Sequence, residues 1–366
     1  MPVNHSTGAD ASSRAQSVGR VTSMARWLAR RRPAAGAGPT ISIVVPVYNA
    51  EKTLRECLSR VFASTARDFE VVIVDDGSTD ASASIAASFP VRIVPTAGRV
   101  GPAAARNLGA RVAEGQVLFF IDSDVMVRPD TVAQLLQRFE QQQELDGLCG
   151  VQAVEMRHRD LVSQYKNLWM RWTYVRCTGD VPLFYTTAAA IRRDRFLEAG
   201  GFDQGYATPN VEDTAFGQRL ARLGMRIRVA PELEVEHVKR YSLGGLLRTD
   251  YLRAVSLARL KLRHPGDLAR NDTSVPVSTM LSVPLSLLAT AALLLALALR
   301  VPAIAAIGAV AGAVVLGFNR DFLRTIAESE GWSRAAASIP LLWLELLVSG
   351  AGAAVGVLSY VLGRRY

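Results

Sequence analysis

Short β-branched runs alternate with amphipathic stretches between residues 41 and 154, and this alternation limits the possible folds more than any other feature of the chain. Such alternation is typical of βαβ units stacked around a parallel sheet. We therefore predict an α/β domain with a mostly parallel, Rossmann-like central sheet. The predicted strands are residues 41–47, 70–75, 91–95, 117–122 and 147–154, and the predicted helices are 51–64, 80–88, 102–114 and 129–142.

The first four predicted strands are almost unbroken apolar runs, as expected for strands that are buried on both faces of a sheet. In an open α/β sheet, ligands bind beyond the carboxyl ends of the strands. Polar segments directly follow the first, second and fourth strands: Pro46-Val47-Tyr48-Asn49, Asp75-Asp76-Gly77-Ser78 and Asp122-Ser123-Asp124. We expect these three segments to meet in one ligand site.

Asp122 and Asp124 are separated by one residue, so their carboxylates can share a face and bind a hard cation through oxygen. Mn²⁺ and Mg²⁺ both accept carboxylate and phosphate oxygens, and either would neutralise a diphosphate and assist its departure. Asp-x-Asp is common on turns, and its place directly after the apolar run 117–121 makes the prediction specific. His237, after a strand-like segment, is a further candidate for a metal ligand or diphosphate contact, although a structural histidine is the simpler interpretation.

A carboxylate of the Asp75-Asp76 pair could accept a hydrogen bond from a uracil ring or from ribose hydroxyls. The alternative for this segment is an ordinary Asp-Gly-Ser turn. The segment Gly98-Arg99-Val100-Gly101-Pro102 then leads into a predicted helix that carries Arg106-Asn107. Because a cation and a helix N-terminus both suit an anion, we expect this segment to hold an anionic ligand.

Glu212 and Asp213 open a predicted helix at residues 214–223. A carboxylate there could deprotonate an acceptor hydroxyl, provided that it lies within hydrogen-bond reach of the acceptor. Capping of the helix N-terminus is the alternative role.

The last quarter of the chain is far more apolar than the rest, with segments at 277–299, 301–318 and 339–362. Each is near the length needed to cross a hydrocarbon core of about 30 Å. The second segment could instead be a hairpin partner or a re-entrant piece, and the C-terminal arginines 364 and 365 fit two spans better than three. We expect Glu345, within the third segment, to snorkel to the membrane surface rather than to serve a function inside it.

The positive charge of the chain is concentrated beside the predicted spans and in the first 38 residues. The basic residues before the first span are Arg248, Arg253, Arg259, Lys261, Arg263 and Arg270. Such a cluster predicts that the preceding domain lies in the cytoplasm. The net charge of +9 indicates an anionic partner. Its distribution favours an anionic bilayer over nucleic acid, so no nucleic acid partner is expected.

Composition divides the chain into four regions: a disordered basic tail at 1–38, an α/β domain at 40–245, a juxtamembrane basic amphipathic region at 246–274 and a membrane domain at 275–366. The tail lacks the apolar residues needed for a core. The aromatic stretch 161–176 either lies at the level of the lipid headgroups or packs in a core. The three cysteines include no Cys-x-x-Cys pair, so we expect neither a disulfide framework nor a zinc site.

Together these segments resemble the inverting glycosyltransferases of family 2, which have the GT-A fold. The resemblance covers residues 40–245 and rests on four motifs in the family's order, at 43–49, 74–78, 105–107 and 122–124. It implies a nucleotide-diphospho-sugar transferase that uses Mn²⁺ or Mg²⁺ and a nucleotide-sugar, with uridine favoured over guanosine.

The resemblance also implies roles for single residues. Asp124 and Asp122 would hold the metal ion, with His237 as the further candidate from the sequence pattern. Asp213 matches the family's catalytic base, with Glu212 beside it, and the activated acceptor would invert the anomeric carbon. The segments at 189–193 and 200–203 resemble the acceptor-side region. The nucleotide-sugar would be bound by Pro46, Tyr48, Asn49, Glu51, Asp75, Asp76, Arg99, Asp122 and Ser123.

One departure from the family concerns processive synthases, which carry a Gln-x-x-Arg-Trp motif that Gln218-Arg219-Leu220-Ala221 lacks. Single-sugar transfer is therefore favoured. Spans that follow the catalytic domain imply a multi-pass protein of the inner (cytoplasmic) membrane with a lipid-linked or glycolipid acceptor. The alternatives are a transferase of exopolysaccharide assembly with a non-lipid acceptor and a non-catalytic membrane scaffold. A nucleotidyltransferase is disfavoured because residues 46–51 contain no glycine.

Overall fold

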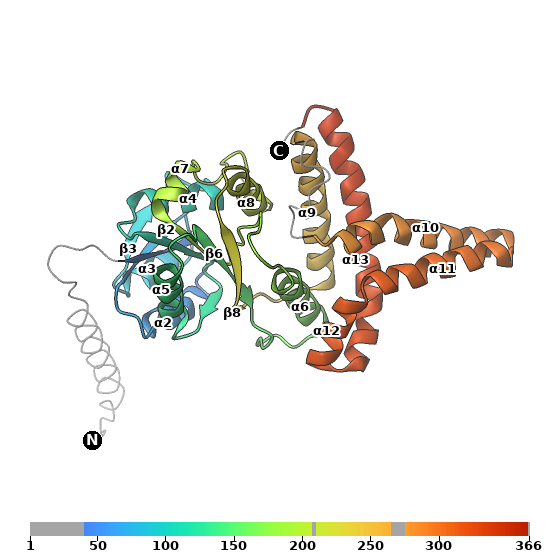
Figure 1. Ribbon diagram of the computed structural model, residues 1–366, viewed down its shortest axis with the longest axis horizontal. Coiled ribbons are helices and arrows are strands. Elements are labelled where there is room, and N and C mark those ends of the chain that lie inside the picture. The colour runs from blue at the N-terminus through green and yellow to red at the C-terminus, as the bar shows by residue number, and fades with distance from the viewer. Residues whose placement is uncertain (1–39, 207–209, 265–274, 365–366) are drawn as a thin grey trace, which may run out of the picture.

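The computed structural model describes residues 40–206, 210–264 and 275–364, and Figure 1 shows an α/β domain beside a group of long helices. The predicted tail at 1–38 lies outside the described residues, as do Arg270 and Arg365. Every strand and helix predicted between residues 41 and 154 is present, with its ends shifted by at most three residues.

A sheet of eight strands forms the centre of the described domain, in the order β3-β2-β1-β4-β7-β6-β8-β5. β1, β2, β3 and β4 run parallel, as predicted, and β6 is parallel to β8. β7 is antiparallel to both of its neighbours, and β5 is antiparallel to β8. The strands are β1 Ile41–Val47, β2 Phe69–Asp75, β3 Arg92–Pro95, β4 Val117–Ile121, β5 Val125–Val127, β6 Gly147–Gln152, β7 Ala188–Arg192 and β8 Ile227–His237.

Helices cover the sheet and continue toward the C-terminus as a separate helical group (Figure 1). In the α/β domain they are α2 Leu54–Phe62, α3 Ser82–Ala87, α4 Pro102–Val112, α5 Thr131–Gln141, α6 Leu161–Val175, α7 Arg193–Glu198 and α8 Glu212–Arg222. The helical group comprises α9 Leu243–Arg263, α10 Val277–Leu299, α11 Pro302–Phe318, α12 Arg320–Glu330 and α13 Trp332–Val361.

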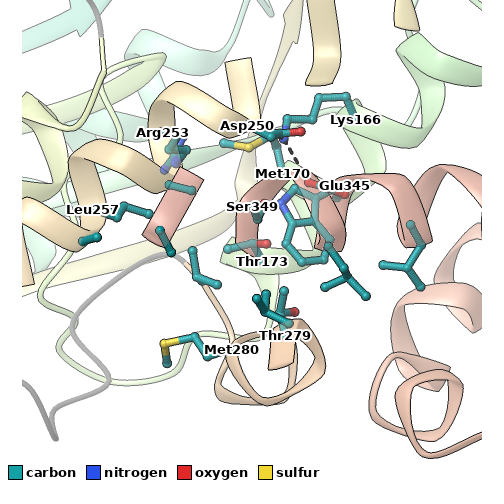
Figure 2. Close-up of a pocket in the computed structure, with 18 of the residues that line it drawn as sticks. Lys166, Met170, Thr173, Asp250, Arg253, Leu257, Thr279, Met280, Glu345 and Ser349 are labelled. Atoms are coloured by element: carbon teal, nitrogen blue, oxygen red, sulfur yellow. Dashed lines mark hydrogen bonds and ion pairs between the residues drawn. The ribbon is translucent and has the colours of Figure 1, made fainter. Parts of the chain in front are cut away.

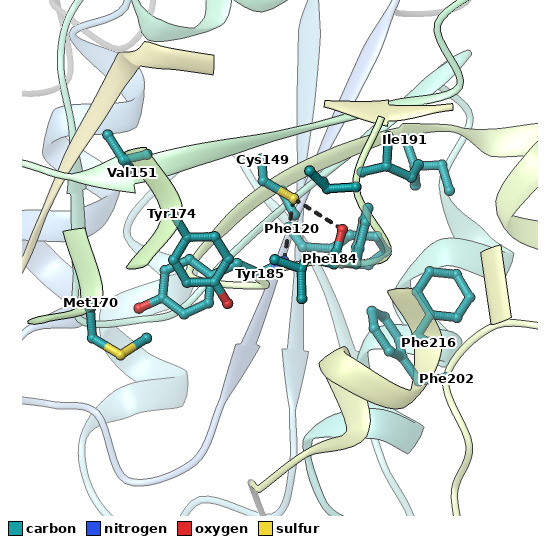
Figure 3. Packing of buried hydrophobic residues seen from close by; sticks show 14 of the residues in the cluster. Phe120, Cys149, Val151, Met170, Tyr174, Phe184, Tyr185, Ile191, Phe202 and Phe216 are labelled. Carbon is teal, nitrogen blue, oxygen red and sulfur yellow. Dashed lines mark hydrogen bonds between the residues drawn. The ribbon is translucent and has the colours of Figure 1, made fainter. Parts of the chain in front are cut away.

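Alternate residues of the central strands enter two separate cores, one on each face of the sheet. Val44 and Phe120 belong to the core that continues toward α6 and α8, where Tyr174 and Tyr185 stack with ring centroids 4.5 Å apart (Figure 3). The prediction of burial on both faces is therefore confirmed for β1, β2 and β4. It is wrong for β3, because β3 is the edge strand and its residues Arg92 and Ile93 are exposed.

Two helices, α10 and α13, are each long and apolar enough to cross a membrane. The predicted second span, α11, passes this test only together with α12, and the two are bent by 60° at the break between them. The chain therefore has two candidate spans among the described residues, or three if the bent pair counts as one. The third predicted segment begins earlier than expected, at Trp332.

α9 lies against α13 at close range, and two glycines of α13 make this possible. A Cβ atom on Gly352 would lie 2.5 Å from the carbonyl oxygen of Tyr251, and one on Gly356 would lie 2.5 Å from that of Val255. Small residues allow helix backbones to approach in this way. α9 is thereby held directly against a candidate span.

Glu345 does not snorkel, which corrects the prediction from the sequence. It is buried within α13 and accepts hydrogen bonds from the hydroxyl of Tyr165 and the ammonium group of Lys166. Both donors belong to α6, which covers this part of α13 with its own side chains. The aromatic residues of α6 likewise pack in a core, since Tyr165 and Trp169 meet the ring of Phe322 at 5.3 and 5.1 Å.

Candidate functional site

The carboxyl end of β4 brings Asp122, Asp124 and His237 together, with one ligand atom of each within 4.8 Å of the others. β5 begins directly after Asp124 and pairs antiparallel with β8, so that Val125 lies opposite His237. The amide of Val238 donates to the carbonyl oxygen of Asp124 at 2.8 Å and fixes this register. The sheet therefore assembles one cluster of oxygen and nitrogen ligands from two distant segments.

Hydrogen bonds orient the members of this cluster. His237 Nε2 lies 3.3 Å from Asp124 Oδ2. Burial disfavours the charged form of Asp124, but His237 and Lys239 together outweigh burial and lower the pKa of this carboxyl below its ordinary value. The other imidazole nitrogen, Nδ1, lies 3.3 Å from the amide nitrogen of Gln152. That same amide donates to the Tyr185 hydroxyl at 2.8 Å. Gln152, itself held by Tyr185, therefore orients the ring of His237.

Arg106 links a predicted metal ligand, Asp122, to a predicted catalytic residue, Glu212. Its guanidinium donates to Asp122 at 2.7 Å and to Glu212 at 3.1 Å, and only 4% of the residue is exposed. Burial opposes the charge, but the two carboxylates outweigh it and raise the pKa of Arg106. In the structure, both hydrogen-bond partners of Arg106 are therefore carboxylates of the protein itself.

Asn107, the next residue of α4, holds the predicted acceptor-side segment at 200–203 through two hydrogen bonds. Its side-chain amide donates to the carbonyl oxygen of Phe202 at 2.8 Å, and its oxygen accepts from the Phe202 amide at 2.8 Å. Gly201, which precedes Phe202, has φ +69°, and a Cβ atom there would lie 2.5 Å from Asn107 Oδ1. Adjacent residues of one helix thus organise both halves of the site.

Glu212 and Asp213 have different surroundings, although they are neighbours in the sequence. Glu212 is buried and accepts hydrogen bonds from Arg106 and from the amide of Asn210. The side chain of Asp213 is half-buried. The loss of hydration around its carboxyl, followed by the charge of Glu212, raises the pKa of Asp213 to about 6. The helix begins at Glu212 with Val211 as its N-cap, so the N-capping alternative for this pair is wrong.

The predicted nucleotide-binding carboxylates Asp75 and Asp76 accept hydrogen bonds from backbone amides of the protein. Asp76 accepts from the amides of Val100 and Gly101 at 2.8 and 2.9 Å, and thereby holds the loop that carries Arg99. The guanidinium of Arg99 lies 4.2 Å from the ring centre of Tyr48. Asp75 accepts from the amide of Ser78 at 3.0 Å, as in the turn that was the alternative interpretation.

The first loop is tied to the second by side-chain hydrogen bonds. Asn49, in the left-handed conformation with φ 50°, accepts from the amide of Thr79 at 2.8 Å. Glu51 accepts from the amide of Ala81 at 3.2 Å. Pro46 and Ser123 are half-buried at the ends of β1 and β4. The nine predicted nucleotide-sugar residues thus lie at or after the carboxyl ends of β1, β2, β3 and β4, and Asp122 also belongs to the metal-ligand cluster.

Comparison with known proteins decides the family. Residues 42–199 match the sequence pattern of Glycosyl transferase family 2. The succinoglycan biosynthesis protein ExoO of Rhizobium meliloti is 35% identical over 242 residues, which cover 62% of this chain and 68% of ExoO. The chain belongs to glycosyl transferase family 2. Two further relatives, the glycosyltransferases GlyG and GlyA of Streptococcus pneumoniae, are each 36% identical, but the chain spans only 38% and 15% of their lengths.

The fold of this family 2 domain is GT-A. The mannosyltransferase PcManGT from Pyrobaculum calidifontis, solved in complex with GDP-Man and Mn²⁺, superposes with a TM-score of 0.54 and is 19% identical. The alignment covers 96% of this chain and 97% of that one, so the likeness includes the C-terminal helices.

Two residues at the site of this family 2 chain were not predicted from its sequence. Gln152 ends β6, whereas the predicted strand continued to residue 154, so the rule that site residues follow strands did not indicate it. Arg253 of α9 acts electrostatically on Asp213, which lies 40 positions away on α8. The sequence showed Arg253 only as one of six basic residues beside a span, and no local pattern connected it to the carboxylate.

Proposed function

We propose that the protein is a metal-dependent inverting glycosyltransferase that moves single sugars from a nucleotide-sugar, preferably UDP-linked, to a lipid or glycolipid acceptor at the membrane. One observation carries the proposal: Arg106 connects the Asp122, Asp124 and His237 cluster to Glu212, beside the carboxylate of Asp213. A donor bound at the cluster and an acceptor bound at Asp213 would therefore lie close together, because the ion pairs of Arg106 fix the distance between the two sets of residues.

The residues present suit a divalent cation. Carboxylate oxygens and one imidazole nitrogen are ligands that Mn²⁺ takes readily, and Mg²⁺ accepts the carboxylates. Gln152 can present either its amide or its oxygen to Nδ1 of His237, and in the second case Nε2 keeps its lone pair for a metal ion. When bound, the ion would neutralise the diphosphate of the donor as it leaves. The Mn²⁺ in the PcManGT complex supports this assignment.

Asp213 is the proposed general base. Its carboxylate would take the proton of the acceptor hydroxyl while the hydroxyl oxygen forms a bond to the anomeric carbon. The bond from that carbon to the diphosphate breaks at the same time, and the configuration inverts. A pKa of about 6 suits a base that works near neutral pH. Glu212, paired with Arg106, would position Arg106 and Asp213 rather than exchange a proton.

The membrane part of the proposal rests on α10 and α13, the two candidate spans, and on the basic residues of α9. We propose that the domain at 40–245 lies on the cytoplasmic side of the inner membrane, that region 246–274 lies at the membrane surface and that 275–366 forms the membrane domain. A transferase of exopolysaccharide assembly is the second candidate, because ExoO is a succinoglycan biosynthesis protein.

The test uses the full chain in lipid nanodiscs, incubated with Mn²⁺ and a panel of radiolabelled nucleotide-sugars in the presence of total membrane lipid. We expect label in the organic phase after lipid extraction, and loss of that label in EDTA. Label that enters only soluble products would refute the lipid acceptor and favour the second candidate. Loss of label in Asp213→Asn would support the proposed base. Asp130→Asn, which alters an exposed carboxylate at the start of α5, is the matched control and should transfer label like the native chain.

A further inference from the structure

α13 contacts the α/β domain and α9 over most of its length. Near its start, Arg334 donates to the carbonyl oxygen of Arg159 in the domain at 3.2 Å. Near its end, Ser359 accepts from the guanidinium of Arg259 on α9 at 2.9 Å. These two contacts are 25 residues apart on α13, about 37 Å at a rise of about 1.5 Å per residue. The separation exceeds the thickness of a hydrocarbon core, about 30 Å.

Charged groups also fill the middle of this interface. Lys166 of α6 pairs with Asp250 of α9 and with Glu345 of α13, and Figure 2 shows the three side chains together. α9 carries five basic residues, which are Arg248, Arg253, Arg259, Lys261 and Arg263. If α13 crossed the bilayer, α6 and α9 would have to lie beside it within the hydrocarbon, where charged side chains are costly. The contacts of α13 therefore argue against its crossing.

The side of α13 that faces away from α6 and α9 is apolar and exposed. Leu344, Val355 and Leu358 lie on this side, whereas Glu345 and Gly352 on the other side are buried. A helix that packs against charged helices on one side and exposes apolar side chains on the other suits the interface between lipid headgroups and hydrocarbon. Such a helix lies parallel to the plane of the membrane.

α10 and α11 form an antiparallel hairpin that points away from the α/β domain, across the direction of α9 and α13 (Figure 1). At its open end, the side-chain amide of Asn319 donates to the hydroxyl of Ser282 at 2.8 Å. Within it, a Cβ atom on Gly308 would lie 3.1 Å from the carbonyl oxygen of Ala289, so the two helices pack closely. Arg300, at the turn, is the one charged residue between 275 and 318. The hairpin therefore suits hydrocarbon everywhere except at its tip.

This hairpin is long enough to cross a bilayer. Thr279 of α10 lines the same cavity as Leu257 and Lys261 of α9, so this part of α10 lies at the level of α9. Arg300 follows 21 residues later, about 31 Å along the helix. α11 returns with 17 residues, within the range of about 17–25 that a span needs. The tip at Arg300 can thus reach the opposite headgroup layer.

α12 marks the return of the chain to the level of the α/β domain. Its last residue, Glu330, accepts from the side-chain amide of Gln164 on α6 at 3.1 Å. The other charged residues of α12 are exposed: Arg320, Asp321, Arg324 and Glu328. The bend of 60° between α11 and α12 therefore lies where a crossing helix would leave the hydrocarbon. α13 then begins on the same side of the membrane as the domain.

We propose that α10 and α11 cross the bilayer as a hairpin, with the turn at Arg300 on the far side, and that α13 does not cross. α13 instead lies parallel to the membrane plane in the near leaflet, whose acyl chains cover Leu344 and Leu358. Both ends of α13, and Arg364 after it, lie on the side of the α/β domain, which agrees with the preference of arginine for the cytoplasmic side. The inference rests on the membrane location in the proposed function and is independent of the reaction.

The first test measures on which side of the membrane single cysteines react. It uses spheroplasts of a bacterial host that contain the full chain, with Cys177→Ser as the parent because Cys57 and Cys149 are buried. The new cysteines replace exposed residues of the domain, the turn, the start of α13 and its end: Asp130→Cys, Val301→Cys, Ser333→Cys and Arg364→Cys. A membrane-impermeant maleimide is added before or after lysis. We expect Val301→Cys to react before lysis and the other three to react only after it.

Other topologies predict different patterns. If Arg364→Cys reacts on the side opposite to Asp130→Cys, α13 crosses the bilayer. If Ser333→Cys does so, α11 does not cross. Either result overturns the proposal, as does a Val301→Cys that reacts on the same side as Asp130→Cys or on neither side. Each variant should melt at the temperature of the parent, and each cysteine should react in the denatured chain.

A second test measures the depth of α13 in the membrane. A bimane fluorophore is attached to Leu344→Cys or Leu358→Cys, which are exposed on the same face of α13 and about 21 Å apart along the helix. If α13 lies parallel to the membrane, both labels have one depth, and lipids brominated at one position of their chains should quench both equally. The same label on Asp130→Cys should not be quenched. Unequal quenching of the two α13 labels, or quenching of neither, would overturn the proposal.

Sugar transfer, measured in the same membranes, separates this inference from the proposed function. Transfer by a chain whose α13 crosses the bilayer overturns the proposed topology and leaves the transferase intact. The expected cysteine pattern in a chain that transfers no sugar supports the topology and overturns the proposed reaction. If Asp130→Cys reacts before lysis and Val301→Cys only after it, the hairpin is supported and the cytoplasmic location of the domain is overturned.

Discussion

His237 lies opposite Val125 in the ladder between β8 and β5, and this pairing brings its imidazole to Asp124, 113 positions earlier in the sequence. A three-residue strand is thus enough to complete a candidate metal site. Asp122 and Asp124 would be two neighbouring carboxylates on a turn without it. The antiparallel half of the sheet supplies the ligand that distinguishes this site from an acidic turn.

Replacing His237 with alanine should weaken Mn²⁺ binding. Loss of one ligand is expected to lower the apparent affinity at least as much as loss of a second-shell partner, about 10–100-fold. Calorimetric titration of Mn²⁺ in the presence of UDP measures this change. His158→Ala is the control, because His158 lies outside the cluster. Equal effects of the two substitutions would remove His237 from the metal site.

Asp213→Asn should lower turnover by about 10²–10⁴-fold while nucleotide binding is retained, since general-base catalysis contributes about that much. In the native chain, turnover should rise with pH through about 6 and then level off, because the base acts when it is deprotonated. The variant should lose this rise. Initial rates between pH 5 and 8, with the same donor and acceptor, provide the measurement. A native pH profile in the variant would assign the base elsewhere.

The same substitution should make the folded protein more resistant to heat at pH 7.5. The pKa of Asp213 is raised in the folded state, chiefly by burial, so the folded chain binds a proton more tightly than the unfolded chain does. Its contribution to stability is therefore present at low pH and is lost as the pH rises through about 6. Asparagine carries no charge at any pH, and the gain in melting temperature should vanish near pH 4.

Arg106→Met should destabilise the domain strongly, because it leaves Asp122 and Glu212 without their shared partner. Removing one member of a buried ion pair typically costs about 3–5 kcal/mol. The melting temperature in nanodiscs reports the effect. Arg138→Met is the comparison, since the ion pair of Arg138 with Glu232 is exposed and such pairs contribute about 0–1 kcal/mol. Similar shifts in both variants would contradict a bridging role for Arg106.

Gly201→Ala should impair both stability and transfer, and Gly179→Ala should impair stability alone. Both glycines have positive φ, +69° and +70°, so alanine strains the backbone similarly at each. Only at Gly201 would the new Cβ meet another group, Asn107 Oδ1 at 2.5 Å, whereas at Gly179 nothing lies within 4 Å. Thermal melting combined with transfer rates separates the shared strain from the displacement of the acceptor-side segment. Equal loss of transfer in the two variants would contradict the assignment of that segment.

The sequence predicted the parallel half of the sheet well, because each of its strands is a local apolar run followed by a helix. The Asp-x-Asp pair could be placed for the same reason, since it ends such a run. The antiparallel strands β5 and β7 were not predicted, because β5 has only three residues and β7 is the alanine-rich segment Ala188–Arg192. Their pairing depends on contacts far apart in the chain, which no local pattern expresses.

Errors at single residues had a common cause, which is burial by distant segments. The pairing of Arg106 was not predicted because its carboxylate partners lie at 122 and 212. Glu345 looked like a snorkelling residue because it lies near the start of the predicted segment 339–362, whereas its partners Tyr165 and Lys166 come from a helix about 180 positions earlier. The strand Arg92–Pro95 looked buried because its sequence is largely apolar. Its place at the edge of the sheet depends on the order of the strands, which the local sequence does not show.

The close contact of α9 with Gly352 and Gly356 of α13 has a consequence for how acceptors are chosen. Even a methyl group at either position would push the two helices apart. The close contact therefore fixes the position of α9 relative to the candidate span α13. The proposed base, Asp213, would then be held at a constant height relative to the bilayer. Acceptors would be sorted by how far their reactive hydroxyl projects from the hydrocarbon boundary, and a head group one sugar longer or shorter would miss the donor.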